Sequence, residues 1–492
     1  MANKRARLSP LRMILLFVAL VLIVVSWWQV GQAAAGLVVR HVDQDGLPLR
    51  FVIAEGVQNA PGVLIGHGFS GSQQLMLAYG YVLAHAGYGV MLLDFAGHGA
   101  NATPFVQGEP VLTQNVALAT AVLQAQPEVD ASRLALIGHS MGSRAVLEAG
   151  VDQGDLYRAT IAISPGDVAV DENWPRNLLL MAGSLEAPFL RNAQAVLARA
   201  GGPNPDFSQD KARALVVVDG AEHMSILFRP LSHNAALDWL NNVFGVQRAS
   251  AYQDVRIIWY GLHLAAWLVA LLALSPLLPS SKTLRGADRR RPFHWLGLVL
   301  GAAAGTAVVW LLDQVIGMAY LGGLAVGGAL GVWFFVVGLV WLLTGFRPFK
   351  PVPRRLAWGL AIFASLWLAF GLLSQWVWLP WFLIPARLLR WLPLTVTFVP
   401  WLLAAGIAMQ GAKGWSRLGW WAWQSVVLVP ALIGLVFLVP GLAFLALVVV
   451  TIPLVVGVMT IVGAAIDDAW AYSLGGALFF SWLILTVFPL AG

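Results

Sequence analysis

One serine stands in a setting that suits a nucleophile. Residues 138–142 read GHSMG and match the pattern G-x-S-x-G, in which the central hydroxyl, here that of Ser140, can attack an acyl carbonyl. An ordinary serine in a glycine-rich turn satisfies so short a pattern equally well. The flanking residues favour the nucleophile, because a strand is predicted over 133–138 and a helix over 141–150. The sharp turn between them keeps a serine hydroxyl accessible.

Apolar, β-branched runs alternate with helical stretches around this motif, from residue 36 to about residue 250. Buried strands are predicted over 62–66, 88–94, 133–138, 159–164, 177–183 and 214–220, and helices near 72–86, 111–126, 141–150, 190–200 and 233–244. Two earlier runs, 36–43 and 47–55, predict a leading hairpin. The alternation predicts an α/β domain with a mostly parallel sheet and helices on both faces.

The order of strand, GHSMG turn and helix resembles the α/β-hydrolase superfamily, in particular compact members similar to dienelactone hydrolases and acyl peptidases. The resemblance covers residues 37–245 and implies the α/β-hydrolase fold. A second stretch, DFAGHG at residues 94–99, is similar to the D-x-R-G-H-G sequence common in this superfamily, with Ala96 where arginine is usual. That stretch is generally structural, so the resemblance implies that His98 orders a loop and is not the catalytic base.

The resemblance also implies a catalytic triad in the chain order Ser140, Glu186, His223. The acid of such a triad commonly follows the seventh strand in a G-x-x-D turn, and Glu186 takes that place with glutamate instead of aspartate. Asp219, at the end of the last predicted strand, is the alternative acid. The base usually lies in a loop after the last strand, which is the position of His223; His233, the alternative, adjoins the predicted terminal helix.

Two backbone N–H groups are implied as the oxyanion hole. In this superfamily one donor belongs to the residue after the nucleophile, here Met141, and the other to a loop after the third strand. Residues 66–69 read GHGF at the end of a predicted strand, which gives Phe69 the second position. Gly68 would let this loop approach the substrate closely. A plain β-to-α loop is the alternative interpretation of the same residues.

The implied reaction is acyl transfer through an acyl-enzyme. His223 would remove the proton of Ser140 as its Oγ attacks the carbonyl, Glu186 would orient His223, and water would hydrolyse the acyl-enzyme. We expect no cofactor for this chemistry and no metal, because the histidines lack metal-ligand spacing. No long insertion separates the predicted strands 159–164 and 177–183, where a cap usually sits, so an open site for bulky or membrane-delivered esters is expected.

The rest of the chain is far more apolar than the predicted α/β domain. Of the 492 residues 59% are hydrophobic and 11% are charged, and mean hydropathy is +0.75, which is too high for a fully soluble protein. Residues 1–35 predict an N-terminal signal anchor or signal peptide, with Lys4, Arg5, Arg7 and Arg12 before an apolar run over 13–30. The length of that run favours an uncleaved anchor.

A transmembrane helical domain is predicted over residues 251–492. Its eight expected spans lie near 256–277, 294–313, 318–343, 356–376, 391–410, 419–439, 442–465 and 469–489. Three intervening loops, 281–291, 346–355 and 412–417, hold 11 of the 14 basic residues that follow residue 255. The positive-inside rule assigns these loops to the cytoplasm, and the hydrolase domain, residues 36–250, to the extracytoplasmic side of the cell membrane. Tryptophan and proline in 374–391 predict an interfacial or re-entrant segment.

The net charge of +6 does not indicate a nucleic-acid partner. Between residues 36 and 255 there are 12 basic and 20 acidic residues, so the positive excess belongs to the membrane-flanking loops. The expected partners are therefore an acyl ester or lipid substrate and the lipid bilayer. The sequence leaves the oligomeric state open, and the absence of cysteine excludes disulfides.

Three functions fit these features. The preferred one is a membrane-bound serine hydrolase that cleaves ester bonds; an acyltransferase or peptidase could use the same triad. The third is a membrane transport or lipid-handling protein with a degenerate hydrolase domain. Transport requires polar groups inside the spans, and the main candidates are Asp313, His263, Asp467 and Asp468, most of them near predicted span ends.

Overall fold

The computed structural model describes residues 8–106, 108, 110–278, 290–347 and 350–492. Among the predicted features, Lys4, Arg5, Arg7 and most of the loop 281–291 lie outside the described residues. The contacts divide the chain into two compact units. One unit comprises Trp27–Tyr260 with Ser374–Phe382, and the other comprises Met1–Ser26, Gly261–Leu373 and Leu383–Gly492.

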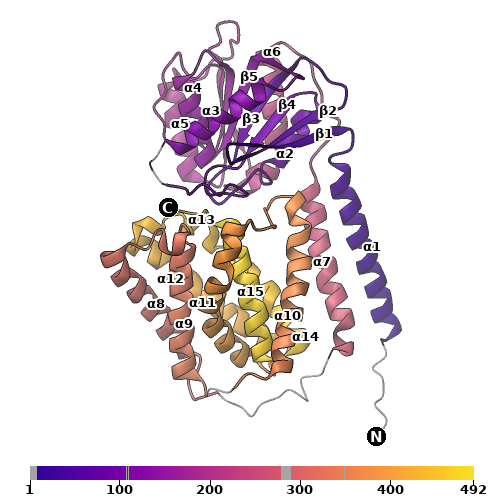
Figure 1. The fold of residues 1–492 in the computed structure, drawn as a ribbon, viewed down its shortest axis with the longest axis vertical. Coiled ribbons are helices and arrows are strands. Elements are labelled where there is room, and N and C mark those ends of the chain that lie inside the picture. Colours follow the sequence, from indigo (N-terminus) through magenta and orange to yellow (C-terminus); the bar gives the residue numbers. More distant parts are fainter. Residues whose placement is uncertain (1–7, 107, 109, 279–289, 348–349) are drawn as a thin grey trace. The chain divides into compact units, whose positions relative to one another are not determined.

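The first unit is built on one sheet of eight strands (Figure 1). In sequence order these are β1 (Leu37–Gln44), β2 (Leu47–Ala54), β3 (Ala60–Gly66), β4 (Gly89–Leu93), β5 (Val129–His139), β6 (Tyr157–Ile163), β7 (Leu178–Gly183) and β8 (Arg213–Val218). Their order in the sheet is β1-β2-β4-β3-β5-β6-β7-β8. The β1–β2 hairpin is antiparallel and β2 pairs antiparallel with β4, whereas the other pairs are parallel.

Helices cover both faces of this sheet. They are α2 (Leu77–His85), α3 (Val111–Gln124), α4 (Met141–Asp152), α5 (Ala187–Arg199) and α6 (Pro230–Phe244), with a 3-10 turn η1 (Ser225–Phe228) before α6. Side chains alternate along the strands, so Val63 and Ile65 of β3 pack in one core with α2 and α6, while Leu64 packs in a second core with α3 and α4. The predicted mostly parallel sheet with helices on both faces is confirmed, and it fits the α/β-hydrolase fold.

The segment Ser374–Phe382 belongs to the first unit although it lies far along the chain. Trp378 packs against the core beneath α2 and α6, and the main-chain oxygen of Trp376 accepts a 2.7 Å hydrogen bond from Arg256 Nη1. Arg256 is itself buried and ion-paired with Asp254. The interfacial or re-entrant character that the sequence predicts over 374–391 stays a prediction; in the structure, Ser374–Phe382 packs in the first unit and α11 begins at Pro385.

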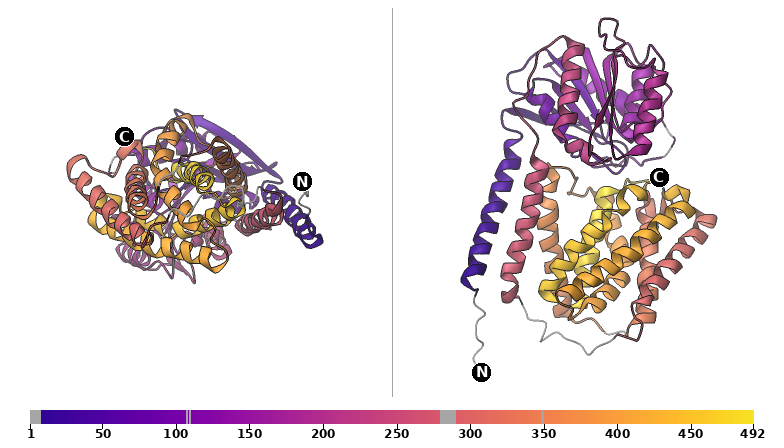
Figure 2. Two further views of the ribbon diagram at one scale, coloured as in Figure 1. Left: turned by 90° about the horizontal axis from the view of Figure 1, so that it is seen from below. Right: turned by 180° about the vertical axis from the view of Figure 1, so that it is seen from behind.

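The second unit is helical (Figures 1 and 2). Its long helices are α1 (Pro10–Gln32, which continues into the first unit), α7 (Arg256–Leu274, which begins there), α8 (Leu296–Ile316), α9 (Gly327–Gly345), α10 (Pro353–Leu366), α11 (Pro385–Met409), α12 (Trp415–Leu438) and α15 (Ala469–Val487). Helix α10 has 14 residues by itself and continues through the π-helical turn η5 (Trp367–Leu372), so that the apolar helical segment covers Pro353–Trp376. The shorter helices are α13 (Leu445–Val449) and α14 (Ile452–Ile466). In the described residues, eight helices are long and apolar enough to cross a membrane by length and composition.

Two predicted spans differ from the structure. The run 442–465 forms two short helices, α13 and α14, because Pro453 near the start of α14 lacks a backbone N–H to continue a helix from α13. The span predicted over 318–343 begins as a helix only at Gly327. Residues before it turn at Gly322 and Gly323, which have positive φ angles of 69° and 71°.

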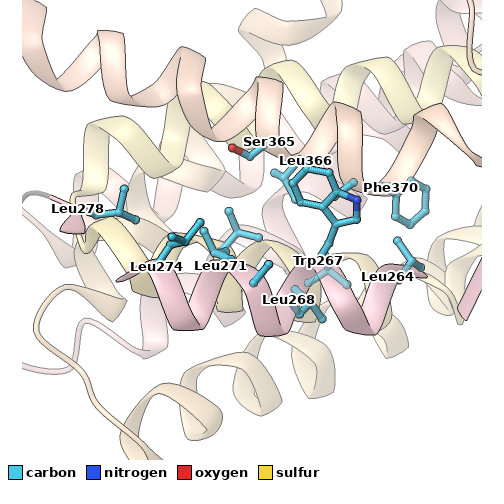
Figure 3. A pocket seen from close by; sticks show the side chains of 13 residues that line it. Leu264, Trp267, Leu268, Leu271, Leu274, Leu278, Ser365, Leu366 and Phe370 are labelled. Carbon is cyan, nitrogen blue, oxygen red and sulfur yellow. The ribbon is translucent and has the colours of Figure 1, made fainter. Parts of the chain in front are cut away.

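Close packing in the second unit depends on small residues. Helix α8 packs on α9, α9 on α11, α11 on α15, and α15 on α10. A Cβ added at Gly338 of α9 would lie 1.9 Å from the backbone nitrogen of Trp401 in α11, so only glycine permits this approach. An apolar cavity of about 220 Å³ lies between α7, α10 and α14 (Figure 3). The hydroxyl of Ser365 in its wall donates to the Ala361 oxygen at 2.8 Å.

Candidate active site

Ser140 occupies a strained turn between β5 and α4. Its φ and ψ angles are 53° and −115°, a conformation that non-glycine residues rarely adopt and that is typical of a nucleophile elbow. Glycines make the turn sterically feasible, since a Cβ at Gly138 would lie 2.3 Å from the Gly142 oxygen. A Cβ at Gly142 would lie 2.5 Å from the main-chain oxygen of His67. The Ser140 N–H donates to the Ile163 oxygen at 2.9 Å, which fixes the turn to the end of β6.

His223 lies between Ser140 and Glu186. It is in the loop after β8, and its Nε2 is 3.1 Å from Ser140 Oγ. Its Nδ1 is 2.9 Å from Glu186 Oε2. A proton on Nδ1, donated to the carboxylate, leaves Nε2 as the acceptor for the serine hydroxyl. The three side chains thus form a hydrogen-bonded series in the order that proton removal from a serine requires.

Glu186 is held by two further donors. It follows β7 and directly precedes α5, and it is only 5% exposed. Its Oε1 accepts hydrogen bonds from the Gly183 N–H at 2.6 Å and from Ser164 Oγ at 2.8 Å. The two donors satisfy Oε1 and leave Oε2 directed at His223. Sequence reasoning missed Ser164, because its place beside Glu186 follows from the pairing of β6 with β7 in the folded sheet.

The alternative acid and bases have other partners. Asp219 is exposed and accepts a 3.2 Å hydrogen bond from Ser184 Oγ. His233 is buried in α6, where its Nε2 donates to the Leu227 oxygen at 2.8 Å; burial lowers the pKa of His233 and favours its neutral form. His98 Nδ1 donates at 2.8 Å to the oxygen of Ala96, two residues away in its own loop. The structure therefore brings none of the three into the series.

The loop that contains Phe69 runs beside Ser140. A Cβ added at Gly68 would lie 3.0 Å from Ser140 Cβ, which shows how closely the backbone passes. Met141 is the first residue of α4, and the first N–H groups of a helix have no partner within it. Backbone N–H groups of Phe69 and Met141 thus belong to the two segments that flank the Ser140 hydroxyl.

The buried His67 forms hydrogen bonds that hold that loop in place. His67 Nδ1 donates to the Gly68 oxygen at 2.8 Å, and its Nε2 accepts a 3.0 Å hydrogen bond from the Phe95 N–H. Burial lowers the pKa of His67, so the ring stays neutral and can accept at Nε2. Asp94 anchors the same region, because its carboxylate accepts from the Gln73 N–H at 2.8 Å. The sequence alone does not indicate this role for His67 or Asp94.

Two aromatic rings lie against the His223 imidazole. The Phe189 ring is stacked at 4.2 Å between centroids with an interplanar angle of 23°. The His139 ring lies 4.7 Å away with an angle of 42°. Both rings restrict the orientation of the imidazole. Within the described part of the chain, no cluster of three or more histidine and acidic side chains is arranged to hold a metal ion.

The chain has similarity to known hydrolases over this unit. Residues 58–236, which include Ser140, Glu186 and His223, match the sequence profile of a family described as serine aminopeptidase, S33. Epoxide hydrolase A of Mycobacterium tuberculosis is 33% identical over 131 residues, which are 25% of this chain and 38% of that protein. The chain thus matches well under half of the length of that relative.

Several solved structures are also similar. A dienelactone hydrolase-like promiscuous phosphotriesterase from metagenomic libraries has 17% identity and a TM-score of 0.35, with 43% of this chain and 99% of that chain covered. A membrane phospholipase A described as a bacterial virulence factor has 16% identity and a TM-score of 0.35, with 47% and 94% covered. Dienelactone hydrolase from Anabaena variabilis has 18% identity and a TM-score of 0.32, with 43% and 98% covered. The family match over residues 58–236 supports a hydrolase activity for this part of the chain.

Proposed function

We propose that the protein is a membrane-bound serine hydrolase that cleaves ester bonds through an acyl-enzyme. Ser140 is the nucleophile, His223 the general base and Glu186 the acid that orients it. The observation that supports this proposal is the pair of hydrogen bonds that join the three side chains in series, at 3.1 Å and 2.9 Å. The strained turn at Ser140 supports it further, because strain of this kind is characteristic of functional serines in such folds.

The first half-reaction forms the acyl-enzyme. Ser140 Oγ attacks the acyl carbonyl while its proton passes to His223 Nε2, and the resulting imidazolium is stabilised by the carboxylate of Glu186. The backbone N–H groups of Phe69 and Met141 stabilise the negative oxygen of the tetrahedral intermediate. The proton on His223 then passes to the leaving alcohol, and the ester bond breaks.

The second half-reaction releases the acid. A water molecule loses its proton to His223 Nε2 and attacks the acyl carbon, and a second tetrahedral intermediate forms in the same oxyanion hole. Its collapse returns the proton from His223 to Ser140 Oγ. An alcohol in place of water would turn the same site into an acyltransferase, and the amide of a peptide could enter as the acyl donor. The name of the matched family makes peptide amides the second substrate class to test.

The proposal includes the cell membrane as the location. In the part of the chain that the structure describes, eight helices have the length and composition of membrane spans, and in the sequence basic residues gather in the segments 281–291, 346–355 and 412–417. With residues 1–35 as an anchor and 251–492 as the membrane domain, the positive-inside rule assigns the hydrolase domain, residues 36–250, to the extracytoplasmic side.

Transport is the weaker alternative, because its candidate polar groups have local partners. Asp313 accepts a 2.8 Å hydrogen bond from the Met318 N–H, and the His263 ring meets the Trp267 ring edge-on at 6.3 Å between centroids. Asp467 pairs with Arg417 at 2.6 Å. The carboxylate of Asp468 caps α15. Each group stabilises a helix end or a helix contact, which favours a scaffold or anchor.

Labelling of the full-length protein in detergent with a fluorophosphonate probe tests the proposal. We expect stoichiometric labelling that is lost in Ser140→Ala and retained in Ser132→Ala, a matched change at an exposed serine of the same unit. Labelling that persists in Ser140→Ala would refute the assignment of the nucleophile. A series of p-nitrophenyl esters of rising chain length, compared with aminoacyl p-nitroanilides, then separates an esterase from a peptidase.

A further inference from the structure

His139, the residue before Ser140, contacts three segments of the proposed active site: the turn at Ser140, the loop of His223 and the loop that contains Gly68. It ends β5, so its backbone continues directly into the nucleophile turn. Its Nε2 is 3.0 Å from the main-chain oxygen of His223. Its Nδ1 would lie 2.8 Å from a Cβ added at Gly68, so the ring also abuts the oxyanion loop. The side chain is only 2% exposed.

The hydrogen bond to His223 fixes the tautomer of His139. A carbonyl oxygen can only accept, so Nε2 carries the proton and donates it, and Nδ1 is the bare nitrogen. Burial, together with the nearby His223, lowers the pKa of His139 well below its usual value. The ring therefore donates one hydrogen bond without adding a positive charge beside the base that must become an imidazolium.

Core packing alone does not explain a histidine at position 139. Nδ1 of His139 is buried and has no hydrogen-bond partner among the described residues, and an unsatisfied buried nitrogen destabilises a fold. A leucine would occupy the space without that cost. The one hydrogen bond that the ring does make ends on the backbone of the proposed general base.

We infer that His139 is a positioning residue for the reaction, which rests on the function proposed above. Its hydrogen bond to the main-chain oxygen of His223 fixes the position of the loop after β8 relative to β5. The position of this loop in turn determines the 3.1 Å separation between His223 Nε2 and Ser140 Oγ. Without this bond the loop gains freedom, and the imidazole spends less time within reach of the serine hydroxyl. The effect falls on kcat, because the base acts in the chemical step and His139, which is only 2% exposed, acts through the backbone of His223.

The chain permits a matched set of substitutions at position 139. In His139→Gln the amide nitrogen lies the same number of bonds from Cβ as the imidazole Nε2, so it can still donate to the His223 oxygen. In His139→Asn the amide nitrogen corresponds to Nδ1 and falls short. His139→Leu fills the volume and donates nothing. Each variant is made in the full-length protein, and its active sites are titrated with the fluorophosphonate probe, so that rates refer to competent molecules only.

Hydrolysis of p-nitrophenyl butyrate per titrated site is then measured. We expect kcat of His139→Leu and His139→Asn to fall by about ten- to a hundredfold with KM within about twofold, and His139→Gln to recover most of the loss. Equal kcat for all three variants and the wild type would overturn the inference, as would a His139→Gln variant as slow as His139→Asn at an unchanged unfolding temperature. If His139→Leu does not fold, the comparison of Gln with Asn decides alone.

The two proposals fail in different ways. If the probe does not label the wild-type protein, the proposed serine hydrolase is refuted. The role of His139 is then refuted as well, because no base remains for it to position. A wild-type protein that is labelled at Ser140, with position 139 indifferent to substitution, would overturn the role of His139 and leave the serine hydrolase intact.

Discussion

Ser164 Oγ donates a 2.8 Å hydrogen bond to Glu186 Oε1, the carboxylate oxygen that faces away from His223. The two residues follow neighbouring parallel strands, Ser164 after β6 and Glu186 after β7, so the sheet itself brings them together. Ser164 is fully buried and has a positive φ of 48°, which directs its side chain into the site and out of the regular strand pattern. The proposed acid therefore depends on a hydroxyl from the next strand.

Removal of that hydroxyl is expected to slow catalysis. A hydrogen bond to a charged group contributes about 1.5–3 kcal/mol, so we expect kcat of Ser164→Ala to fall by about tenfold or more as Glu186 loses its fixed orientation. Ser164→Gly is the control, since glycine tolerates the positive φ but also lacks the hydroxyl. Equal losses in kcat in both variants assign the effect to the hydroxyl. A loss in Ser164→Ala alone would assign it to backbone strain and contradict the prediction.

Substitution of the acids is expected to distinguish Glu186 from Asp219. Glu186→Gln keeps the shape of the side chain but removes the negative charge beside His223. We expect kcat to fall by about a thousandfold or more, as it does when a triad acid is replaced by its amide. Asp219→Asn should leave kcat within about twofold, because Asp219 is exposed and bonded to Ser184. Steady-state hydrolysis of p-nitrophenyl butyrate measures both. The reverse pattern would exchange the roles of the two carboxylates.

The turn at Ser140 and the mostly parallel sheet could be predicted from local sequence, and the role of Ser140 as nucleophile stays a proposal. The GHSMG motif can be recognised from the strand before it and the helix after it. The other strands are apolar runs that alternate with helices along the chain. Ser164 could not be singled out in the same way, because a serine at a strand end has many uses. Its importance comes from the pairing of β6 with β7, which is a property of the folded sheet.

The helical unit shows a second limit of sequence reasoning. Composition remains apolar through 442–466, so a hydropathy pattern favours one span, whereas the folded chain breaks there into α13 and α14. The contacts of Ser374–Phe382 with the α/β unit include a hydrogen bond from Arg256 to the Trp376 oxygen, which joins residues 120 apart in sequence. Contacts over such a separation leave no periodic signal.

Phe189 is expected to restrict the motion of His223, the proposed base. Its ring stacks on His223 at 4.2 Å, and an aromatic face against an imidazolium contributes about 0.5–1 kcal/mol, so we expect Phe189→Leu to lower kcat by about two- to fivefold. Phe207→Leu is a matched control, because that ring contacts Trp239 at 4.8 Å and does not touch the triad. Kinetics per titrated site should change in the first variant only. An equal loss in both would indicate general destabilisation.

Acid should weaken the α/β unit through its buried histidines. Burial lowers the pKa of His233 in the folded chain below the 6.5 of an exposed imidazole, so at low pH the unfolded chain binds more protons. The stability that neutral His233 contributes is present above pH 6.5 and is lost as the pH falls toward its folded pKa. The temperature of half-inactivation of esterase activity should therefore drop below pH 6.5, with a shallower decline in His233→Gln. If the temperature of half-inactivation falls equally in the wild type and in His233→Gln, groups other than His233 dominate the loss of stability in acid.

A methyl group at Gly68 should damage the oxyanion hole while the fold persists. The added Cβ would lie 2.8 Å from His139 Nδ1 and 3.0 Å from Ser140 Cβ, so the loop that carries the Phe69 N–H must move away from the nucleophile. Loss of one oxyanion donor lowers kcat by about a hundred- to a thousandfold, and we expect Gly68→Ala to approach that range. At Gly166, by contrast, an added Cβ meets only Arg144 Cβ at 3.7 Å. Gly166→Ala should thus keep wild-type kcat, and a Gly68→Ala variant equally active would show that the loop does not hold the oxyanion.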